Sequence, residues 1–339
     1  MGSPSSDYQL NENGIPPFEA LPLQNDAPMY SAWGLYGDND ELGTLNRLTN
    51  ERVAAAAKNE IRTGVRVSLN WPLNAQSKGS FFARKLFHQD LFVKPPRTVN
   101  DDVWTFNTQV SSQWDGLRHF AYQKEKKFYN GVTMEDIHGT GSNGDKTTVN
   151  GIQAWSEKGI VGRGILIDYH TWRLERAKTD PSYASFDAFA TTPISLSDLR
   201  ACLAAQGTEV RFGDILIIRS GWMVAHGTKS DAELAELQRE PPHKFCGVEQ
   251  SEEVLRWIWS NFSAVAGDQA GFECWPTREA WSLHEVLLAG WGCPLGELFD
   301  LERLAEQCKK EGRWSFFVAS EPCNVPGGVA SPPNILAIF

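Results

Sequence analysis

The stretch Val110-Ser-Ser-Gln-Trp-Asp-Gly-Leu-Arg-His-Phe-Ala-Tyr122 is the best candidate for chemistry in the 339-residue chain. It holds an amide (Gln113), a carboxylate (Asp115) and an imidazole (His119), and Gly116 allows a turn after the carboxylate at little steric cost. On an extended backbone Gln113 and Asp115 point the same way, and His119 can converge on them after the turn. A carboxylate and an imidazole can share a metal ion or form an acid–base pair. The alternative is a surface turn capped by Asp115, which the apolar residues around it disfavour.

Composition narrows the classes of function that remain. The chain is 41% hydrophobic and 22% charged, as is ordinary for a soluble globular protein. It has no apolar run of about 18 residues, so we expect no membrane span. The N-terminus lacks a signal-peptide pattern, which favours a cytoplasmic location. A net charge of −10 without a dense basic cluster disfavours a nucleic-acid partner.

The cysteines and tryptophans add two further expectations. None of the six cysteines forms a C-x-x-C pair, so we expect them to be reduced and mostly buried. Thirteen tryptophans is a high number. Some of them belong to the core, but tryptophan also lines pockets for flat ligands, which makes a small-molecule substrate the expected partner.

The pattern along the chain predicts one mixed α/β domain. Residues 1–30 are polar and proline-rich and read as an extended arm over the body or over a partner subunit, and residues 31–339 form the domain. Strands and helices mix without a regular βαβ alternation. Residues 74–102 read as a long excursion and 129–150 as a loop. The predicted helices are 49–61 with Thr49 or Asn50 as its cap, a helix to about residue 205 with Ser195 or Ser197 as its cap, 251–262, 278–289 and 300–310. The predicted strands are 65–72, 103–111, 164–170, 213–221, 264–268, 314–319 and 335–339.

Three later residues are candidate partners for the opening stretch. His284 lies on the apolar side of the predicted helix 278–289, a setting more typical of a core histidine than of a ligand. The glycine-rich turn that follows could fold Glu297 back towards that helix. Asp268 ends a predicted strand and is either a third acidic candidate or a cap. A nucleotide cofactor and a serine-hydrolase mechanism are unsupported, because the chain has no glycine-rich phosphate loop and no G-x-S-x-G elbow.

Six motifs follow one another along the chain. They are Asp115-x-x-x-His119-Phe120, Gly213-Asp-Ile-Leu-Ile-Ile-Arg-Ser-Gly-Trp222, Ala264-Val-Ala-Gly-Asp268, His284-Glu-Val-Leu-Leu, Glu297-x-x-Asp-Leu and Pro326-Gly-Gly-Val-Ala-Ser-Pro332. In this order they resemble the cyclase family that contains bacterial kynurenine formamidase and isatin hydrolase, and the resemblance runs from roughly residue 40 to the C-terminus. It implies a swivelling β/β/α fold, a homo-oligomer (a dimer or a tetramer) and metal-dependent opening of amide or lactam bonds in small aromatic molecules.

The family's metal-binding motif, H-x-G-T-H-x-D-x-P-x-H, is only partly kept. Its first two histidines fall on Gln109 and Gln113, and an amide binds zinc poorly although its carbonyl oxygen suits harder ions. In a two-metal version of the site, one metal would lose most of its ligands. The Q-W-D-G-x-x-H-F form resembles a eukaryotic, mainly fungal, branch, which implies action on a secondary metabolite or xenobiotic. The motif's aspartate, proline and last histidine fall on Asp115, Leu117 and His119, and the later histidine and glutamate ligands on His284 and Glu297.

The first functional hypothesis is therefore a metal-dependent hydrolase of an amide, lactam or lactone. One divalent ion, zinc or manganese, polarises the carbonyl and activates a water molecule. His119 is the general base and then the acid, acting beside Asp115. Trp114, Phe120 and Trp275 clamp a flat substrate. The predicted metal ligands are Asp115, His284 and Glu297, with Gln113 as a further one.

Two other hypotheses stay open. A metal-free lyase, isomerase or cyclase of secondary metabolism could transfer protons with His119 and either Asp115 or Glu297, since two histidine ligands are missing. A non-catalytic small-molecule binding protein could keep the fold and the aromatic pocket. Activity that survives a chelator would favour the former, and tight binding without product would favour the latter.

Overall fold

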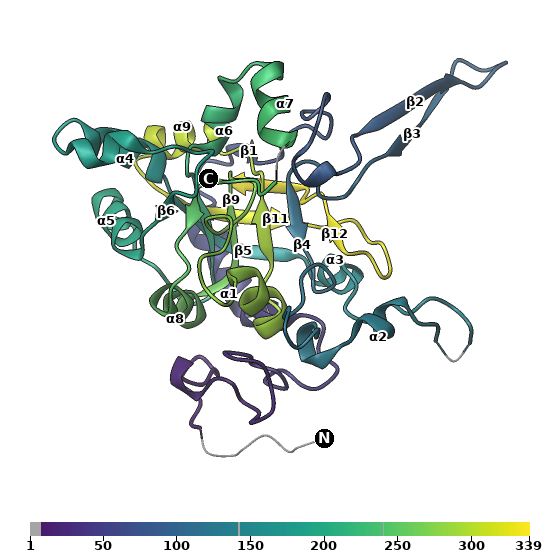
Figure 1. Ribbon diagram of the computed structural model, residues 1–339, viewed down its shortest axis with the longest axis horizontal. Coiled ribbons are helices and arrows are strands. Elements are labelled where there is room, and N and C mark those ends of the chain that lie inside the picture. Colours follow the sequence, from purple (N-terminus) through teal and green to yellow (C-terminus); the bar gives the residue numbers. More distant parts are fainter. Residues whose placement is uncertain (1–7, 142, 240) are drawn as a thin grey trace.

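A nine-stranded mixed sheet forms the centre of the computed structural model, which describes residues 8–141, 143–239 and 241–339 (Figure 1). Its strand order is β1-β13-β11-β5-β7-β9-β10-β4-β12. The four strands β5, β7, β9 and β10 run parallel, and the strands on both sides of them pair antiparallel. The strands are β1 (Arg66–Ser68), β4 (Gln113–Asp115), β5 (Ile160–Ile167), β7 (Asp214–Ile218), β9 (Phe262–Gly267), β10 (Leu295–Glu297), β11 (Ser315–Ser320), β12 (Ala330–Ser331) and β13 (Ile335–Ile338).

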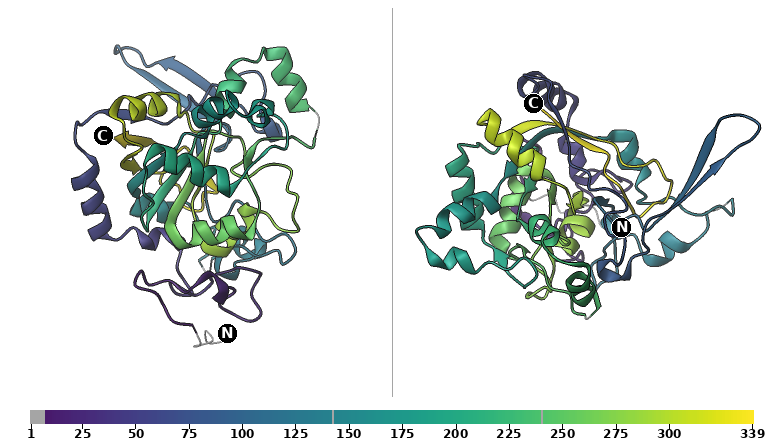
Figure 2. Two further views of the ribbon diagram at one scale, coloured as in Figure 1. Left: turned by 90° about the vertical axis from the view of Figure 1, so that its left-hand side faces the viewer. Right: turned by 90° about the horizontal axis from the view of Figure 1, so that it is seen from above.

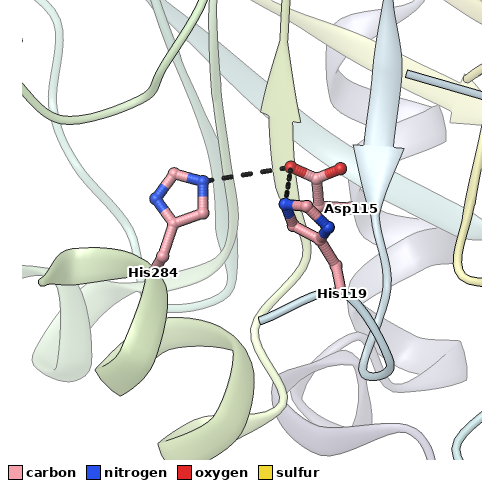
Figure 3. Close-up of side chains that lie close together, drawn as sticks. All are labelled: Asp115, His119 and His284. Carbon is pink, nitrogen blue, oxygen red and sulfur yellow. Dashed lines mark ion pairs between the residues drawn. The ribbon is translucent and has the colours of Figure 1, made fainter. Parts of the chain in front are cut away.

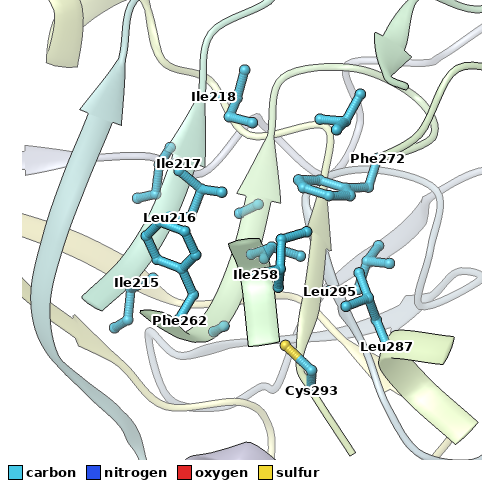
Figure 4. Packing of buried hydrophobic residues seen from close by; sticks show 14 of the residues in the cluster. Ile215, Leu216, Ile217, Ile218, Ile258, Phe262, Phe272, Leu287, Cys293 and Leu295 are labelled. Carbon is cyan, nitrogen blue, oxygen red and sulfur yellow. The ribbon is translucent and has the colours of Figure 1, made fainter. Parts of the chain in front are cut away.

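The middle of the sheet is buried on both faces. The β7 side chains Ile215–Ile218 are fully buried, and Figure 4 shows them with Ile258 and with Leu295 of β10. A parallel strand covered on both faces reads as a continuous apolar run, because neither side of its pleat meets water. The single mixed α/β domain expected from the sequence is confirmed.

Several helices begin at a residue whose side chain caps them. Thr49, Ser195 and Ser251 each accept a hydrogen bond from the backbone N–H three residues on, which confirms three predicted helix starts. The helices are α1 (Asn50–Glu60), α2 (Met134–His138), α3 (Gln153–Lys158), α4 (Tyr169–Ala177), α5 (Leu196–Gln206), α6 (Trp222–Gly227), α7 (Asp231–Arg239), α8 (Glu252–Asn261) and α9 (Glu302–Glu311).

Shorter elements fill the connections. The 3-10 turns are Phe18–Ala20, Gly43–Arg47, Phe81–Ala83, Tyr129–Gly131 and Pro181–Ser185, and Glu285–Gly290 is a π-helix. Two small two-stranded sheets pair β2 (His88–Val93) with β3 (Asn100–Thr105) and β6 (Pro193–Ile194) with β8 (Gly247–Val248).

The helix predicted for residues 278–289 is corrected at its start. Residues 278–282 are not helical, and the helix begins at residue 283. Ser282 Oγ accepts from the Glu285 N–H, and the Glu285 carboxylate accepts from the Ser282 N–H. This reciprocal capping box stops the helix from extending further towards the N-terminus.

The segment before the opening stretch also differs from its prediction. The long excursion contains the β2–β3 hairpin, and the strand expected at 103–111 ends at Thr105. The hairpin projects away from the body (Figures 1 and 2) and exposes Leu91, Val93 and Trp104. The expected association of copies of the chain stays a prediction.

The N-terminal arm lies against its own chain from residue 8 onwards. Ile15 and Phe18 are buried, and Trp259 Nε1 on α8 donates to the Pro16 carbonyl at 2.9 Å. Residues 1–7 lie outside the described part of the chain. Five of the six cysteines are buried, as expected, and Cys323 is exposed. In the described residues we find no helix with the length and apolar character that a membrane crossing requires.

Candidate active site

Strand β4 carries the polar centre of the opening stretch. Alternation along the strand places Gln113 and Asp115 on one face and Trp114 on the other. Glu297 on β10 is the direct antiparallel neighbour of Gln113, and Gln113 Nε2 donates to Glu297 Oε2 at 2.8 Å. Strand pairing fixes Glu297 on this face, and its Oε1 atom lies 3.1 Å from His284 Nε2, so the segment after the helix does bring Glu297 back to the helix, as expected.

Asp115, His119 and His284 lie together at the C-terminal end of β4 (Figure 3). The Asp115 Oδ2 atom is 3.7 Å from His119 Nε2 and 4.0 Å from His284 Nε2. One ligand atom from each of the three residues lies within 4.8 Å of the others, as a shared ion requires. The backbone at Gly116 lies close to Val329, because a Cβ at position 116 would be only 2.7 Å from the Val329 carbonyl oxygen.

The two carboxylate oxygens of Asp115 have different surroundings. Gln109 Nε2 donates to Oδ1 at 2.6 Å, whereas Oδ2 is buried without a hydrogen-bond partner among the described residues. A buried carboxylate oxygen without a partner costs free energy, and a cation removes that cost. The oxygen faces imidazole nitrogens too far away for hydrogen bonds, so this set of donors fits a divalent ion.

His284 is held from behind by Glu273, a residue that sequence reasoning missed. The Glu273 carboxylate lies 2.6 Å from His284 Nδ1 and accepts from the His284 N–H at 3.1 Å. A carboxylate at Nδ1 fixes the tautomer and directs Nε2 into the site, as it does for metal-binding histidines. No recognisable sequence motif contains Glu273. Its backbone is held by a parallel β-bridge to Val248, which is distant in the sequence.

The carboxylates make this buried region strongly acidic. Glu273, Glu297 and Asp115 are all buried, and Glu297 Oε1 is 3.1 Å from His284 Nε2. Burial, with Asp115 as the next cause, raises the pKa of Glu297. Burial alone would lower the pKa of His284, but Glu273 and Glu297 outweigh it and raise that pKa well above its ordinary value. A bound divalent cation would relieve the same excess of negative charge.

Substituting Glu273 tests whether His284 is a positioned ligand. We expect Glu273→Gln to weaken binding of zinc or manganese by about 10- to 100-fold, the usual cost of losing the carboxylate behind a histidine ligand. Metal titration of the purified variant measures this change. Glu60→Gln alters a buried carboxylate that pairs with Arg163 and Arg313, and it should leave metal affinity unchanged. Equal metal affinity in the Glu273 variant and the unmodified protein would contradict the assignment.

His119 is the more accessible of the two histidines. Its side chain is 20% exposed, against 9% for His284. Burial is the largest cause of a lowered pKa for His119 and outweighs the opposing effect of Asp115, so the ring is neutral at pH 7. Gln109 Nε2 lies 3.2 Å from each ring nitrogen and can donate to one of them. A neutral imidazole in this position can bind a metal or accept a proton.

An aromatic pocket of about 360 Å³ opens beside the cluster. Phe120 and Trp275 line it, in agreement with their predicted placement. Arg84 and Phe82 also line it and were not anticipated from the sequence. The full lining is Phe82, Arg84, Gln109, His119, Phe120, Ala270, Gly271, Trp275, His284 and Glu297.

Trp114 does not line the pocket, so its predicted place in the substrate clamp is wrong. It is fully buried, its Nε1 donates to Ser320 Oγ at 2.9 Å, and its ring meets the Phe299 ring edge-on at 5.1 Å. The physical reason is the alternation of β4, which turns Trp114 into the core when Asp115 faces the site.

Of the two roles expected for Asp268, an acidic site residue or a cap, the structure shows the cap. Its carboxylate accepts hydrogen bonds from the backbone N–H groups of Ser220, Gly221 and Met223 at the start of α6. A carboxylate in this position satisfies otherwise unpaired N–H groups. Asp268 is therefore a structural residue and not part of the polar cluster.

Comparison with known proteins places the chain in a family. The family model named "Cyclase" matches residues 21–273, and the chain belongs to that family. A solved structure described as a novel cyclase is 30% identical, covers 91% of this chain and 99% of its own, and has a TM-score of 0.77. No curated protein matches the sequence significantly.

More distant structures share the fold alone. Isatin hydrolase A from Ralstonia solanacearum is 15% identical, with 86% of this chain and 98% of its own covered and a TM-score of 0.55. An isatin hydrolase bound to the product analogue thioisatinate is 14% identical, with 84% and 95% covered and a TM-score of 0.52. The fold expected from the motifs is confirmed by these comparisons.

Proposed function

We propose that the chain is a metal-dependent hydrolase that opens an amide, lactam or lactone bond of a small aromatic molecule. The observation that carries this proposal is the buried, unpartnered Asp115 Oδ2, which faces two imidazole nitrogens beside an aromatic pocket. Membership of the cyclase family supports it. Structures with this fold include proteins named isatin hydrolases, one of them bound to the product analogue thioisatinate, which suggests a small aromatic substrate.

Each polar residue has a distinct part in this proposal. Asp115 Oδ2, His284 Nε2 and the Glu297 carboxylate would hold a zinc or manganese ion. Gln113 Oε1, also buried without a partner among the described residues, would be a further ligand. The ion supplies a Lewis acid that polarises a carbonyl group and acidifies water. Glu273 keeps His284 oriented, and carboxylate and imidazole ligands suit these two metals.

His119 is the proton carrier in the proposal. It lines the pocket, is more exposed than His284, and is neutral at pH 7 because burial lowers its pKa. It would accept a proton from the attacking water molecule and deliver that proton to the leaving nitrogen or oxygen. Gln109 fixes the relative positions of His119 and Asp115 by contacting both. Phe120 and Trp275 would stack on the substrate ring.

Metal removal tests this function. We expect hydrolysis of isatin, a lactam, or of formanilide, an open aromatic amide, to fall at least about 100-fold after chelation, because the Lewis acid contributes several kcal/mol. Zinc or manganese should restore the rate. Product formation by the metal-loaded, chelated and reloaded protein gives the comparison. Full turnover in a verified metal-free sample would rule out the mechanism.

A metal-free lyase, isomerase or cyclase is the second candidate. The observation that favours it is the pair of amides, Gln109 and Gln113, where the resembled motif has histidines. Gln109 already donates to Asp115 Oδ1 at 2.6 Å, which orients that carboxylate without any metal. Activity that persists in chelator but disappears in His119→Ala would move the assignment to this class.

A further inference from the structure

The pocket contains a cationic side chain that the proposed hydrolysis does not use. Among the described residues, Arg84 is the only lysine or arginine that lines the pocket, which it shares with aromatic rings, one amide, two imidazoles and Glu297. Its Nη1 donates to the Gln109 backbone carbonyl at 2.7 Å. A guanidinium carries five N–H donors, and this is the one hydrogen bond of the Arg84 side chain within the described residues. Most of its donors are therefore available to a ligand.

The chain around Arg84 holds it in a defined position. Phe82 and Ala83 both adopt positive φ angles, of 62° and 51°, which L residues rarely do. Ser80 Oγ donates to the Arg84 carbonyl at 2.6 Å, and the Phe82 N–H donates to His243 Nε2 at 3.2 Å. Non-glycine residues in this conformation persist only where the surroundings enforce it, most often at ligand sites.

Aromatic contacts fix the same turn on its other side. Phe81 is buried, with its ring edge-on to Phe245 at 5.0 Å and to Trp222 at 5.9 Å. The Arg84 guanidinium carbon lies 5.2 Å from the centre of the Phe82 ring. The turn thus places Phe81 in the core, and it places Phe82 and Arg84 at the pocket.

The charge of Arg84 acts on the reacting groups. Burial is the main cause of the lowered pKa of His119, and the Arg84 charge adds to it as the smallest cause. Burial and Asp115 raise the pKa of Glu297, and the Arg84 charge opposes that rise. Arginine binds a carboxylate through two parallel N–H bonds, a geometry that a lysine cannot offer. A half-buried guanidinium beside a flat aromatic pocket therefore matches a ligand with an aromatic ring and a carboxylate.

We infer that Arg84 recognises a carboxylate group of the bound molecule, so that the pocket takes small aromatic carboxylates. This inference rests on the proposed function only in using the same pocket. The carboxylate can belong to the substrate itself or be the group that hydrolysis creates. Arg84 is a specificity-determining residue in either case, because it pairs with an anion and takes no part in transferring the proton.

Direct binding tests the inference without requiring turnover. Benzoate and benzamide have nearly the same shape and differ in charge, and calorimetry can measure both on the protein as purified and after chelation. In chelated protein, Arg84→Gln should weaken benzoate binding about 10- to 100-fold, the cost of a hydrogen bond between charged groups, and leave benzamide unchanged. Arg84→Lys should recover only part of the affinity, because the planar fork is lost.

A neighbouring residue supplies the matched control. Lys85 is exposed and does not line the pocket, so Lys85→Gln removes the same charge one residue away. Equal loss of benzoate affinity in both variants would overturn the inference, since it would show only a general effect of charge. Equal loss of benzoate and benzamide in Arg84→Gln would overturn it too, since it would show collapse of the pocket.

Turnover then identifies the source of the carboxylate. Formanilide and 2-formamidobenzoate share the scissile amide, and only the second carries a carboxylate on its ring. A loss of kcat/KM in Arg84→Gln confined to 2-formamidobenzoate assigns the substrate's own carboxylate. A loss for isatin, whose ring opening creates a carboxylate on the aromatic product, but not for formanilide, together with weaker benzoate binding, assigns the carboxylate that is formed. If benzoate binding depends on Arg84 but neither amide is hydrolysed, the inference stands and the proposed hydrolysis fails.

Discussion

Replacing Asp115 with asparagine is expected to lower kcat/KM for the hydrolysed amide by about 1,000-fold. The amide keeps the size of the carboxylate but removes the charge that faces His119 and His284. If Asp115 holds a divalent ion as proposed, loss of that charge would release the ion, together with the several kcal/mol that it would contribute. Steady-state kinetics on the purified variant measure the effect, and thermal unfolding verifies that the variant is folded.

A second buried aspartate makes the comparison specific. Asp214 on β7 pairs with Arg163, and Asp214→Asn should leave the kinetics of the folded protein near those of the unmodified protein. If Asp115→Asn keeps more than about a tenth of the activity, the carboxylate is not a metal ligand.

Replacing Trp114 with alanine is expected to destabilise the protein by about 3–5 kcal/mol, the usual cost of removing a large aromatic side chain from a core. The variant loses contact with Phe299 and the hydrogen bond to Ser320 Oγ. Denaturant unfolding measures the free energy. Trp114→Phe fills more of the space and should cost less, so it permits kinetics on folded protein.

The contrasting variant is Trp275→Ala. Trp275 lines the pocket, so its removal should raise KM for an aromatic substrate with a smaller loss of stability. Trp114→Phe should leave KM within about twofold, because the ring lies on the far face of β4. A higher KM at unchanged stability in Trp114→Phe would place that ring in the substrate pocket after all.

Local signals were sufficient for much of the fold. Thr49, Ser195 and Ser251 cap helices where short-range chemistry predicts them, because a hydroxyl acceptor and a following helical pattern act within one turn. The strand predicted for residues 213–221 is found at Asp214–Ile218, since a short apolar run between turn residues has few alternatives to burial. The family resemblance implied the swivelling β/β/α fold, and the order of the strands follows from long-range pairing that no local pattern contains.

The site was harder to predict, because its partners meet through strand pairing. Glu297 reaches Gln113 by the register of β10 on β4, and Glu273 reaches His284 from a segment with no motif. Trp114 could have been placed correctly: the alternation that aligns Gln113 with Asp115 also turns the residue between them away. Arg84 could not, because its position depends on two left-handed residues that sequence patterns do not reveal.

The metal content of the purified protein, measured by mass spectrometry, tests the central claim most directly. That claim is that Asp115, His284 and Glu297 hold a divalent ion beside His119. We predict about one equivalent of zinc or manganese per chain, and a tenth of that or less in Asp115→Asn prepared in the same way. Equal metal content in the two proteins, or no bound metal in protein that takes up none when zinc or manganese is supplied, would contradict the account.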